Sequence, residues 1–217
     1  MEINLLKSYP KLKRNTNERG ASKTDADQKI ARKFDKDFFD GDRRYGYGGY
    51  NYNEKYWGPV VSDFMKFYGL NAQSKVLDIG CGKGFFLYDL INLIPGLSIS
   101  GIDISSYAIS HSLSFVKPFL QVCDAKKLPF DDNSFDLVVS INTIHNLDIS
   151  ECRQAVKEIE RVSRGSSYII VDAYRSLREK ERMKEWNLTA KTFMHVEDWQ
   201  KFFKNAGYTG DYYWFIP

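Results

Sequence analysis

The chain of 217 residues is long enough for one ordinary domain with a full core, and two full domains would be crowded. A net charge of +3 with 27% charged residues gives no strong electrostatic case for nucleic acid, and the three widely spaced cysteines indicate neither a disulfide framework nor a zinc site. No apolar run approaches the roughly 18 residues that span a bilayer, and the first residues lack the apolar stretch of a signal peptide, so we expect a cytoplasmic protein without membrane contact.

The first 57 residues are expected to form an arm and a lid ahead of the main domain, which we place at residues 58–217. Residues 7–33 are polar and basic, which is typical of a solvated arm or of a segment ordered by a substrate or a partner. A short helix within residues 25–39 would turn Ile30, Phe34 and Phe38 inward.

Residues 38–52 are rich in glycine, tyrosine and arginine. This composition does not suit a regular core element, because glycine costs backbone entropy and arginine is rarely buried unpaired. The segment is either a tyrosine-rich surface turn or, as we favour, a lid over a substrate pocket, in which hydroxyls and guanidinium groups bind polar or anionic groups. The candidate substrate-binding residues in this segment are Arg43, Arg44, Tyr47, Tyr50 and Tyr52.

We expect a helix to begin at Pro59 and end near Gly69, followed by a strand and a glycine-rich turn. The letters VLDI at residues 76–79 predict a buried parallel strand, and GCGKG at residues 80–84 lets the backbone approach a ligand closely. An apolar helix then runs up to Pro95. The spacing differs from the dinucleotide-binding G-x-G-x-x-G/A pattern, whose third small residue is replaced here by Phe85.

This strand and turn resemble motif I of the class I methyltransferases that depend on S-adenosylmethionine (SAM), and the series L-P-F-x-x-x-S-F-D-L-V at residues 128–138 strengthens the resemblance. The resemblance covers about residues 60–175. It implies an α/β fold with a doubly wound, mostly parallel seven-stranded sheet and an N-terminal lid. It also implies SAM as the cofactor, with S-adenosyl-L-homocysteine as the product.

The second strand, residues 97–104, ends in Asp103 beside the glycine turn. A carboxylate at that place can accept both ribose hydroxyl hydrogens of a nucleoside, and the alternative is a charge at the start of the next helix. After a short strand at residues 120–123, the resemblance places Asp124 at the adenine amino group, whereas a surface turn is the alternative. The cofactor-binding residues that we predict are Asp78, Gly80, Cys81, Gly82, Gly84, Asp103, Ile104, Asp124, Ala125 and Asn142.

The apolar strand at residues 135–141 leads to His145 on the expected ligand side of the sheet. An imidazole there could take a proton from an attacking hydroxyl or amine, or it could hold the following helix, residues 148–164, by a hydrogen bond. After a strand at residues 167–171, Asp172 and Tyr174 are candidate substrate-binding residues. Asp172 could orient a substrate donor or cap the next segment.

The C-terminal part is expected to add to the acceptor site. In the resembled family an insertion follows the fifth strand, so Trp186 and His195 within residues 175–195 are candidate pocket residues. A helix at residues 196–206 and a strand at residues 212–216 follow. The resemblance implies that the sheet closes with an antiparallel hairpin, whose first strand would be residues 191–194.

We expect the SAM methyl group to pass to an oxygen or nitrogen of a small, anionic metabolite, with oxygen slightly favoured and Arg43 and Arg44 as the reason for an anion. The motif N/D-P-P-Y/F/W of amino methyltransferases is absent after residue 141, and too few acids are present for a metal-assisted catechol-type site. Because the net charge is modest, nucleic acid is not the expected partner. An RNA or protein methyltransferase with a basic arm along phosphates, and a SAM-binding module without transfer, stay open as alternatives. Monomer and homodimer are equally open.

Overall fold

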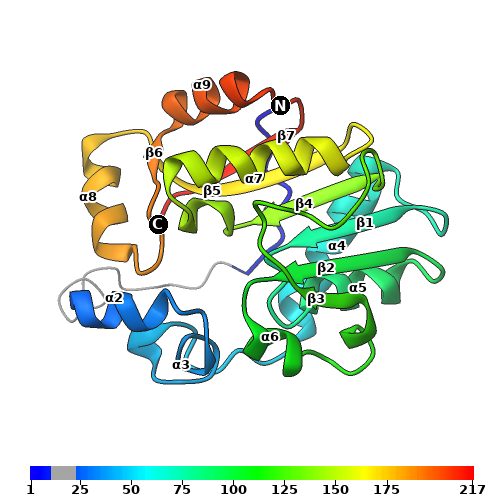
Figure 1. The fold of residues 1–217 in the computed structure, drawn as a ribbon, viewed down its shortest axis with the longest axis horizontal. Coiled ribbons are helices and arrows are strands. Elements are labelled where there is room, and N and C mark those ends of the chain that lie inside the picture. Colours follow the sequence, from blue (N-terminus) through cyan, green and yellow to red (C-terminus); the bar gives the residue numbers. More distant parts are fainter. Residues whose placement is uncertain (11–22) are drawn as a thin grey trace.

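A seven-stranded sheet organises the computed structural model, which describes residues 1–10 and 23–217 (Figure 1). Neighbouring strands follow the order β3-β2-β1-β4-β5-β6, and β7 also pairs with β5. The pairings are parallel, which confirms the predicted α/β, doubly wound architecture. The strands are β1 (Lys75–Ile79), β2 (Ser98–Asp103), β3 (Leu120–Val122), β4 (Leu137–Ile141), β5 (Ser167–Tyr174), β6 (Met194–His195) and β7 (Asp211–Phe215).

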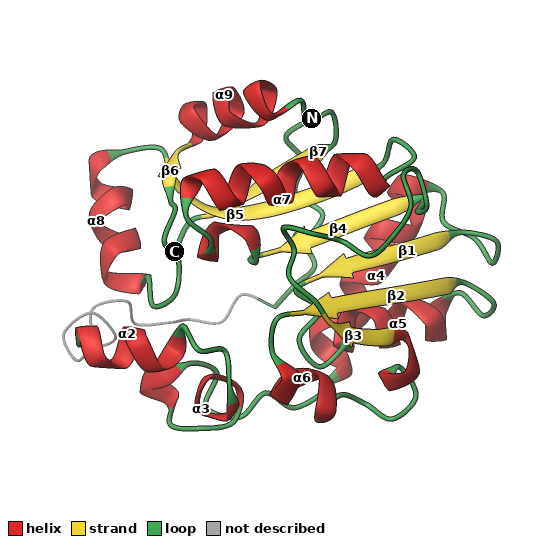
Figure 2. Cartoon of the chain, in the orientation of Figure 1, coloured by secondary structure: helices red, strands yellow, loops and turns green. Residues whose placement is uncertain are grey.

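Helices cover both faces of this sheet, with α7 in front of it and α4 and α5 behind it in Figure 2. The α-helices are α2 (Asp25–Ala31), α3 (Lys36–Phe39), α4 (Glu54–Tyr68), α5 (Phe85–Leu93), α6 (Ser106–Ser110), α7 (Ile149–Val162), α8 (Leu177–Trp186) and α9 (Val196–Ala206). The described residues also form the short 3-10 helices η1 (Arg43–Tyr45), η2 (Lys117–Phe119) and η3 (Ile144–Asn146). No helix within residues 1–10 and 23–217 combines the length and the apolar character needed to cross a membrane.

Alternate residues of β1 pack into two separate apolar cores. Leu77 and Ile79 belong to the core that α7 and α9 cover, where Trp199 is fully buried. Val76 belongs to the core on the other face, which α4 and α5 cover around the fully buried Phe64. Because both faces are covered, the central strands β1, β4 and β5 are mostly apolar.

The predicted antiparallel hairpin at the C-terminus is wrong. Both β6 and β7 run parallel to β5, with Ala173 opposite Met194 and Ile170 opposite Tyr213. The helix α9 lies between β6 and β7 and returns the chain to its starting end, as a parallel connection requires. The strand expected at residues 191–194 is displaced to Met194–His195, and the amide of Ile3 at the N-terminus donates to the Tyr212 carbonyl of β7.

Two predicted helices in the N-terminal part begin or end elsewhere. The helix expected within residues 25–39 is divided into α2 and α3, because Phe34 between them takes a positive φ of 51°. The helix expected from Pro59 begins earlier, since the Asn53 side chain caps α4 by accepting from the Lys55 amide. The predicted division at residues 57 and 58 falls inside α4 and stays a prediction. The basic arm lies partly at residues 11–22, outside the described residues.

Candidate active site

A cavity of about 1010 Å³ lies at the carboxyl ends of β1, β2, β4 and β5, where parallel sheets place ligand-binding side chains. Figure 1 shows these strand ends facing α2 and α3 of the predicted lid and the helix α8. The cavity is at the upper end of the roughly 300–1,000 Å³ found for small-molecule sites. Of the predicted cofactor-binding residues, all but Gly84 line the cavity: Asp78, Gly80, Cys81, Gly82, Asp103, Ile104, Asp124, Ala125 and Asn142.

The glycine turn folds tightly over the end of β2. The amides of Gly80 and Cys81 both donate to the Ile102 carbonyl, at 2.7 and 3.0 Å. Gly80 has a φ of 82°, and a Cβ there would lie 2.0 Å from Thr143 Oγ1, so no other residue fits. The turn therefore presents bare backbone to the cavity.

Asp103 is held in place by two backbone amides. Its Oδ2 accepts from the Gly82 amide at 2.8 Å, and its Oδ1 accepts from the Ser105 amide at 2.8 Å. Burial raises the pKa of Asp103, and these two hydrogen bonds oppose that rise. Asp103 does not cap the next helix, because the N-cap of α6 is Ser105, whose hydroxyl accepts from the Ala108 amide. The Asp103 carboxylate thus faces the cavity in a fixed orientation, as a ribose-binding acid would.

A second acid, Asp78, lies beneath the glycine turn. Burial, together with the charge of Asp103, raises the pKa of Asp78 to about 8. A cationic or hydrogen-bond-donating ligand would offset both the burial of Asp78 and the repulsion from Asp103, so this part of the cavity suits a positively charged ligand.

Asp124 lies on the rim of the cavity and is 43% exposed at its side chain. Its Oδ1 accepts from the Lys126 amide at 2.9 Å, and its Oδ2 lies 3.4 Å from Lys126 Nζ. The expected turn is therefore present, and its position is compatible with contact to a ligand base. That contact stays a prediction.

His145 is buried at the end of β4 and lines the cavity. The Asp172 amide donates to His145 Nδ1 at 3.0 Å, and Asp172 Oδ1 lies 3.7 Å from the same nitrogen. Burial lowers the pKa of His145, although the charge of Asp172 opposes this. A neutral ring whose Nδ1 accepts a hydrogen bond has its proton on Nε2. The geometry therefore favours a hydrogen-bond donor, and the general-base role stays a prediction.

Five of the predicted substrate-binding residues line the cavity, namely Arg43, Tyr47, Tyr50, Asp172 and Trp186. The other four do not. Arg44 is exposed, with its Nε 3.9 Å from Asp27. The Tyr52 hydroxyl donates to the Asp89 side chain of α5. Tyr174 and His195 are the last residues of the paired strands β5 and β6, and their rings pack edge-on. The His195 side chain also caps α9.

Arg32 was missed in the sequence because it lies in a polar run with several other basic residues. It lines the cavity between α2 and the segment after α8. Its Nε donates to the Thr189 carbonyl at 3.2 Å, and its Nη2 lies 3.5 Å from the Ala190 carbonyl. Within the described part of the chain, Arg32 forms no ion pair with a carboxylate. Phe34 and Phe38 line the same end, where the sequence indicated only inward packing.

The sheet order, the glycine turn and Asp103 together define the class I SAM-dependent methyltransferase fold. The family profile described as "Methyltransferase domain" matches residues 70–207, more than half of the chain, and the chain belongs to this family. SAM is the cofactor that this family and fold imply. The residues present fit it, since bare glycine backbone and two buried acids face the cavity.

Relatives differ in what their names say they act on. A tRNA (carboxymethyluridine(34)-5-O)-methyltransferase of Arabidopsis thaliana is 30% identical over 65% of this chain and 33% of its own length. A malonyl-[acyl-carrier protein] O-methyltransferase of Legionella pneumophila is 29% identical over 58% of this chain and 45% of its own. A SAM-dependent methyltransferase structure from Aquifex aeolicus shares the fold, with a TM-score of 0.51, 21% identity and coverage of 68% of this chain and 78% of its own.

The chain therefore spans from a third to about half of the length of these two curated relatives. No group of three or more His, Cys, Asp or Glu side chains within residues 1–10 and 23–217 is arranged to hold a metal ion.

Proposed function

We propose that the protein transfers the SAM methyl group to an oxygen or nitrogen of a small, anionic metabolite. The observation that supports this most is the position of Arg32, a half-buried cation at the lid end of the cavity without a carboxylate partner among the described residues. Phe34 and Phe38 supply apolar surface beside it. An arginine in such surroundings binds carboxylate or phosphate groups well, because its fork makes two parallel hydrogen bonds.

The two ends of the cavity differ in charge. Asp78, Asp103 and Asp124 lie at the cofactor end, where Lys126 pairs with Asp124 and a cationic ligand would favour the ionised form of Asp78. Arg32 and Arg43 lie at the other end. This separation suits a cationic cofactor beside an anionic acceptor. SAM supplies an already activated methyl group, so the task of these residues is to bind, orient and exclude water.

The state of His145 favours oxygen over nitrogen as the methylated atom. Its Nδ1 accepts the Asp172 amide and its Nε2 holds the proton, so the ring offers no free lone pair for a base. An acceptor oxygen that is already anionic needs no base. His145 Nε2 would then orient that oxygen by a hydrogen bond.

The test compares two arginines of the same lid. Once methyl-labelled SAM has identified an acceptor among small-molecule fractions, Arg32→Ala should raise its KM about ten- to a hundredfold, the loss of a charge-assisted hydrogen bond. SAM affinity should stay nearly unchanged. Arg44→Ala is the matched control, because Arg44 lies outside the cavity. Equal changes in the two variants would refute the anion-binding role.

An RNA acceptor is the second candidate, because the Arabidopsis relative is named as a tRNA methyltransferase. Labelled methyl transfer to total tRNA, with binding that weakens steeply as salt rises, would support it over a metabolite. Tight SAM binding with no transfer to either class of acceptor would instead support a SAM-binding module. The oligomeric state can be measured in the same preparations by light scattering.

A further inference from the structure

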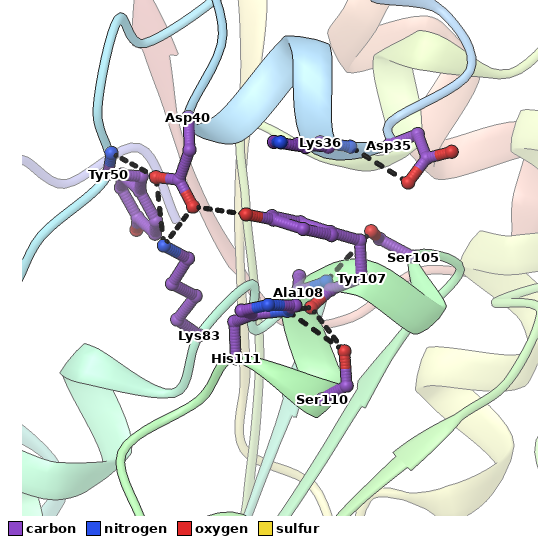
Figure 3. Close-up of polar contacts among 10 residues, drawn as sticks. All are labelled: Asp35, Lys36, Asp40, Tyr50, Lys83, Ser105, Tyr107, Ala108, Ser110 and His111. Carbon is purple, nitrogen blue, oxygen red and sulfur yellow. Dashed lines mark hydrogen bonds and ion pairs between the residues drawn. The ribbon is translucent and has the colours of Figure 1, made fainter.

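Three separate segments of the chain meet at the carboxylate of Asp40, at the end of α3 (Figure 3). Lys83 Nζ, from the glycine turn, lies 2.9 Å from Asp40 Oδ1 and 2.7 Å from Oδ2. The Tyr50 amide donates to Oδ1 at 2.9 Å, and the Tyr107 hydroxyl of α6 donates to Oδ2 at 2.8 Å. We call this group of four residues the clasp.

The clasp is shielded from water. The Lys83 side chain is 7% exposed and that of Asp40 is 23% exposed. Burial acts to raise the pKa of Asp40, but the hydrogen bonds from Lys83, Tyr50 and Tyr107 together outweigh burial and lower that pKa. The Asp40 carboxylate is therefore ionised at neutral pH. A shielded pair of this kind is costly to break by removing one partner, because the other charge is left without compensation.

The clasp places the Tyr50 ring directly on the glycine turn. A Cβ at Gly82 would lie 3.3 Å from Tyr50 Cε1, which is close to contact. The Tyr50 ring also stacks on Phe85 at the start of α5, with ring centroids 4.8 Å apart, and packs at a tilt against Tyr47, with centroids 4.3 Å apart. Tyr50, which the sequence assigned to the substrate, therefore covers the cofactor turn.

Lys83 joins the lid to the cofactor site because of its place in the chain. It stands between Gly82 and Gly84, where the backbone follows the cavity, while its side chain points to the lid (Figure 3). A change in the glycine turn must therefore move the lid, or break the ion pair. No other pair of opposite charges among the described residues joins the glycine turn to the lid.

We propose that Asp40 and Lys83 are positioning residues that hold Tyr50 over the cofactor site, so that SAM and its product exchange only when the clasp opens. The clasp sets how long the product stays bound. This proposal rests on SAM as the family's cofactor and not on the identity of the acceptor.

The experiment measures S-adenosyl-L-homocysteine dissociation by stopped-flow tryptophan fluorescence, since Trp57 and Trp186 line the cavity. Asp40→Asn and Lys83→Met should each raise the dissociation rate about ten- to a hundredfold, as expected for a lost charge-assisted pair. The double variant should show no more than the larger single effect. Tyr107→Phe, which removes one hydroxyl, should give a smaller rise in the same direction.

The control is Lys36→Met, because Lys36 is the first residue of α3, the helix that ends at Asp40, and its side chain is exposed. Hydrogen exchange of the ligand-free variants gives an independent readout, in which residues 36–52 should exchange at least tenfold faster in Asp40→Asn than in Lys36→Met. Dissociation and exchange within twofold of the control in folded Asp40→Asn protein, or additive effects of the two clasp substitutions, would overturn the proposal.

Discussion

Replacing Asp103 with Asn tests the cofactor site most directly. The substitution keeps the shape of the side chain and removes its charge. Both carboxylate oxygens now accept backbone amides at 2.8 Å, from Gly82 and Ser105. In Asp103→Asn one of these amides would face an NH₂ group, so the carboxamide could no longer satisfy both amides and accept from a ribose.

The expected loss follows from the number of charged hydrogen bonds. A hydrogen bond to a charged group contributes about 1.5–3 kcal/mol, and each 1.36 kcal/mol corresponds to a factor of ten. Loss of one such bond to the ribose predicts an affinity for S-adenosyl-L-homocysteine that falls about ten- to a hundredfold. Burial raises the pKa of Asp103, so removing the charge relieves a desolvation cost, whereas the backbone amide left facing the NH₂ group costs about 1–3 kcal/mol. The net loss of stability in Asp103→Asn should therefore not exceed about 3 kcal/mol.

Calorimetric titration with SAM and S-adenosyl-L-homocysteine measures the affinities, and thermal unfolding measures the stability. Asp198→Asn is the matched control, since Asp198 is an exposed carboxylate of α9 that pairs with Lys201 at 3.6 Å, away from the cavity. Unchanged affinity in folded Asp103→Asn protein would remove the ribose-binding assignment. A large loss of stability would show that Asp103 is mainly structural.

Three further predictions concern buried groups. Because the pKa of Asp78 is raised to about 8, the ligand-free protein should lose stability as the pH rises from about 4 to 8. Asp78→Asn should lack that part of the loss, so the difference in Tm between variant and wild type should widen with pH. A difference in Tm that stays constant with pH would contradict the raised pKa. Long-range ¹H–¹⁵N NMR should show His145 neutral with its proton on Nε2 at pH 7, and an imidazolium signal would exclude the donor role. Trp199→Ala should lower the free energy of unfolding by about 3–5 kcal/mol in urea titrations, since the indole is fully buried and donates to the Asp172 carbonyl at 3.0 Å; a loss under 1 kcal/mol would not fit.

The cofactor end of the site was predictable because its signals are local in sequence. Continuous apolar runs identified buried parallel strands, and the end of each run located the ligand side of the sheet. The glycine turn directly follows β1, and Asp103 is the last residue of β2. The parallel pairing of these two strands is therefore enough to bring them together at one edge of the sheet. The cavity accordingly contains nearly all of the predicted cofactor residues.

The lid was not predictable in the same way, because it has no repeating pattern that gives the direction of a side chain. Arg32 and Arg44 are chemically alike and close in sequence, yet only Arg32 lines the cavity. Arg32 ends α2 and donates to the Thr189 carbonyl after α8, whereas Arg44 lies in η1 and its side chain is near Asp27.

Strands β1 to β5, the glycine turn and the acids that line the cavity could therefore be predicted from the sequence. The tertiary structure alone decided the direction of β6 and β7, the acceptor end of the cavity and the pairing of Asp40 with Lys83. The physical reason is that the burial pattern of a strand depends on residues that are adjacent in the sequence. A contact between an aspartate and a lysine 43 positions apart depends on how the whole chain packs.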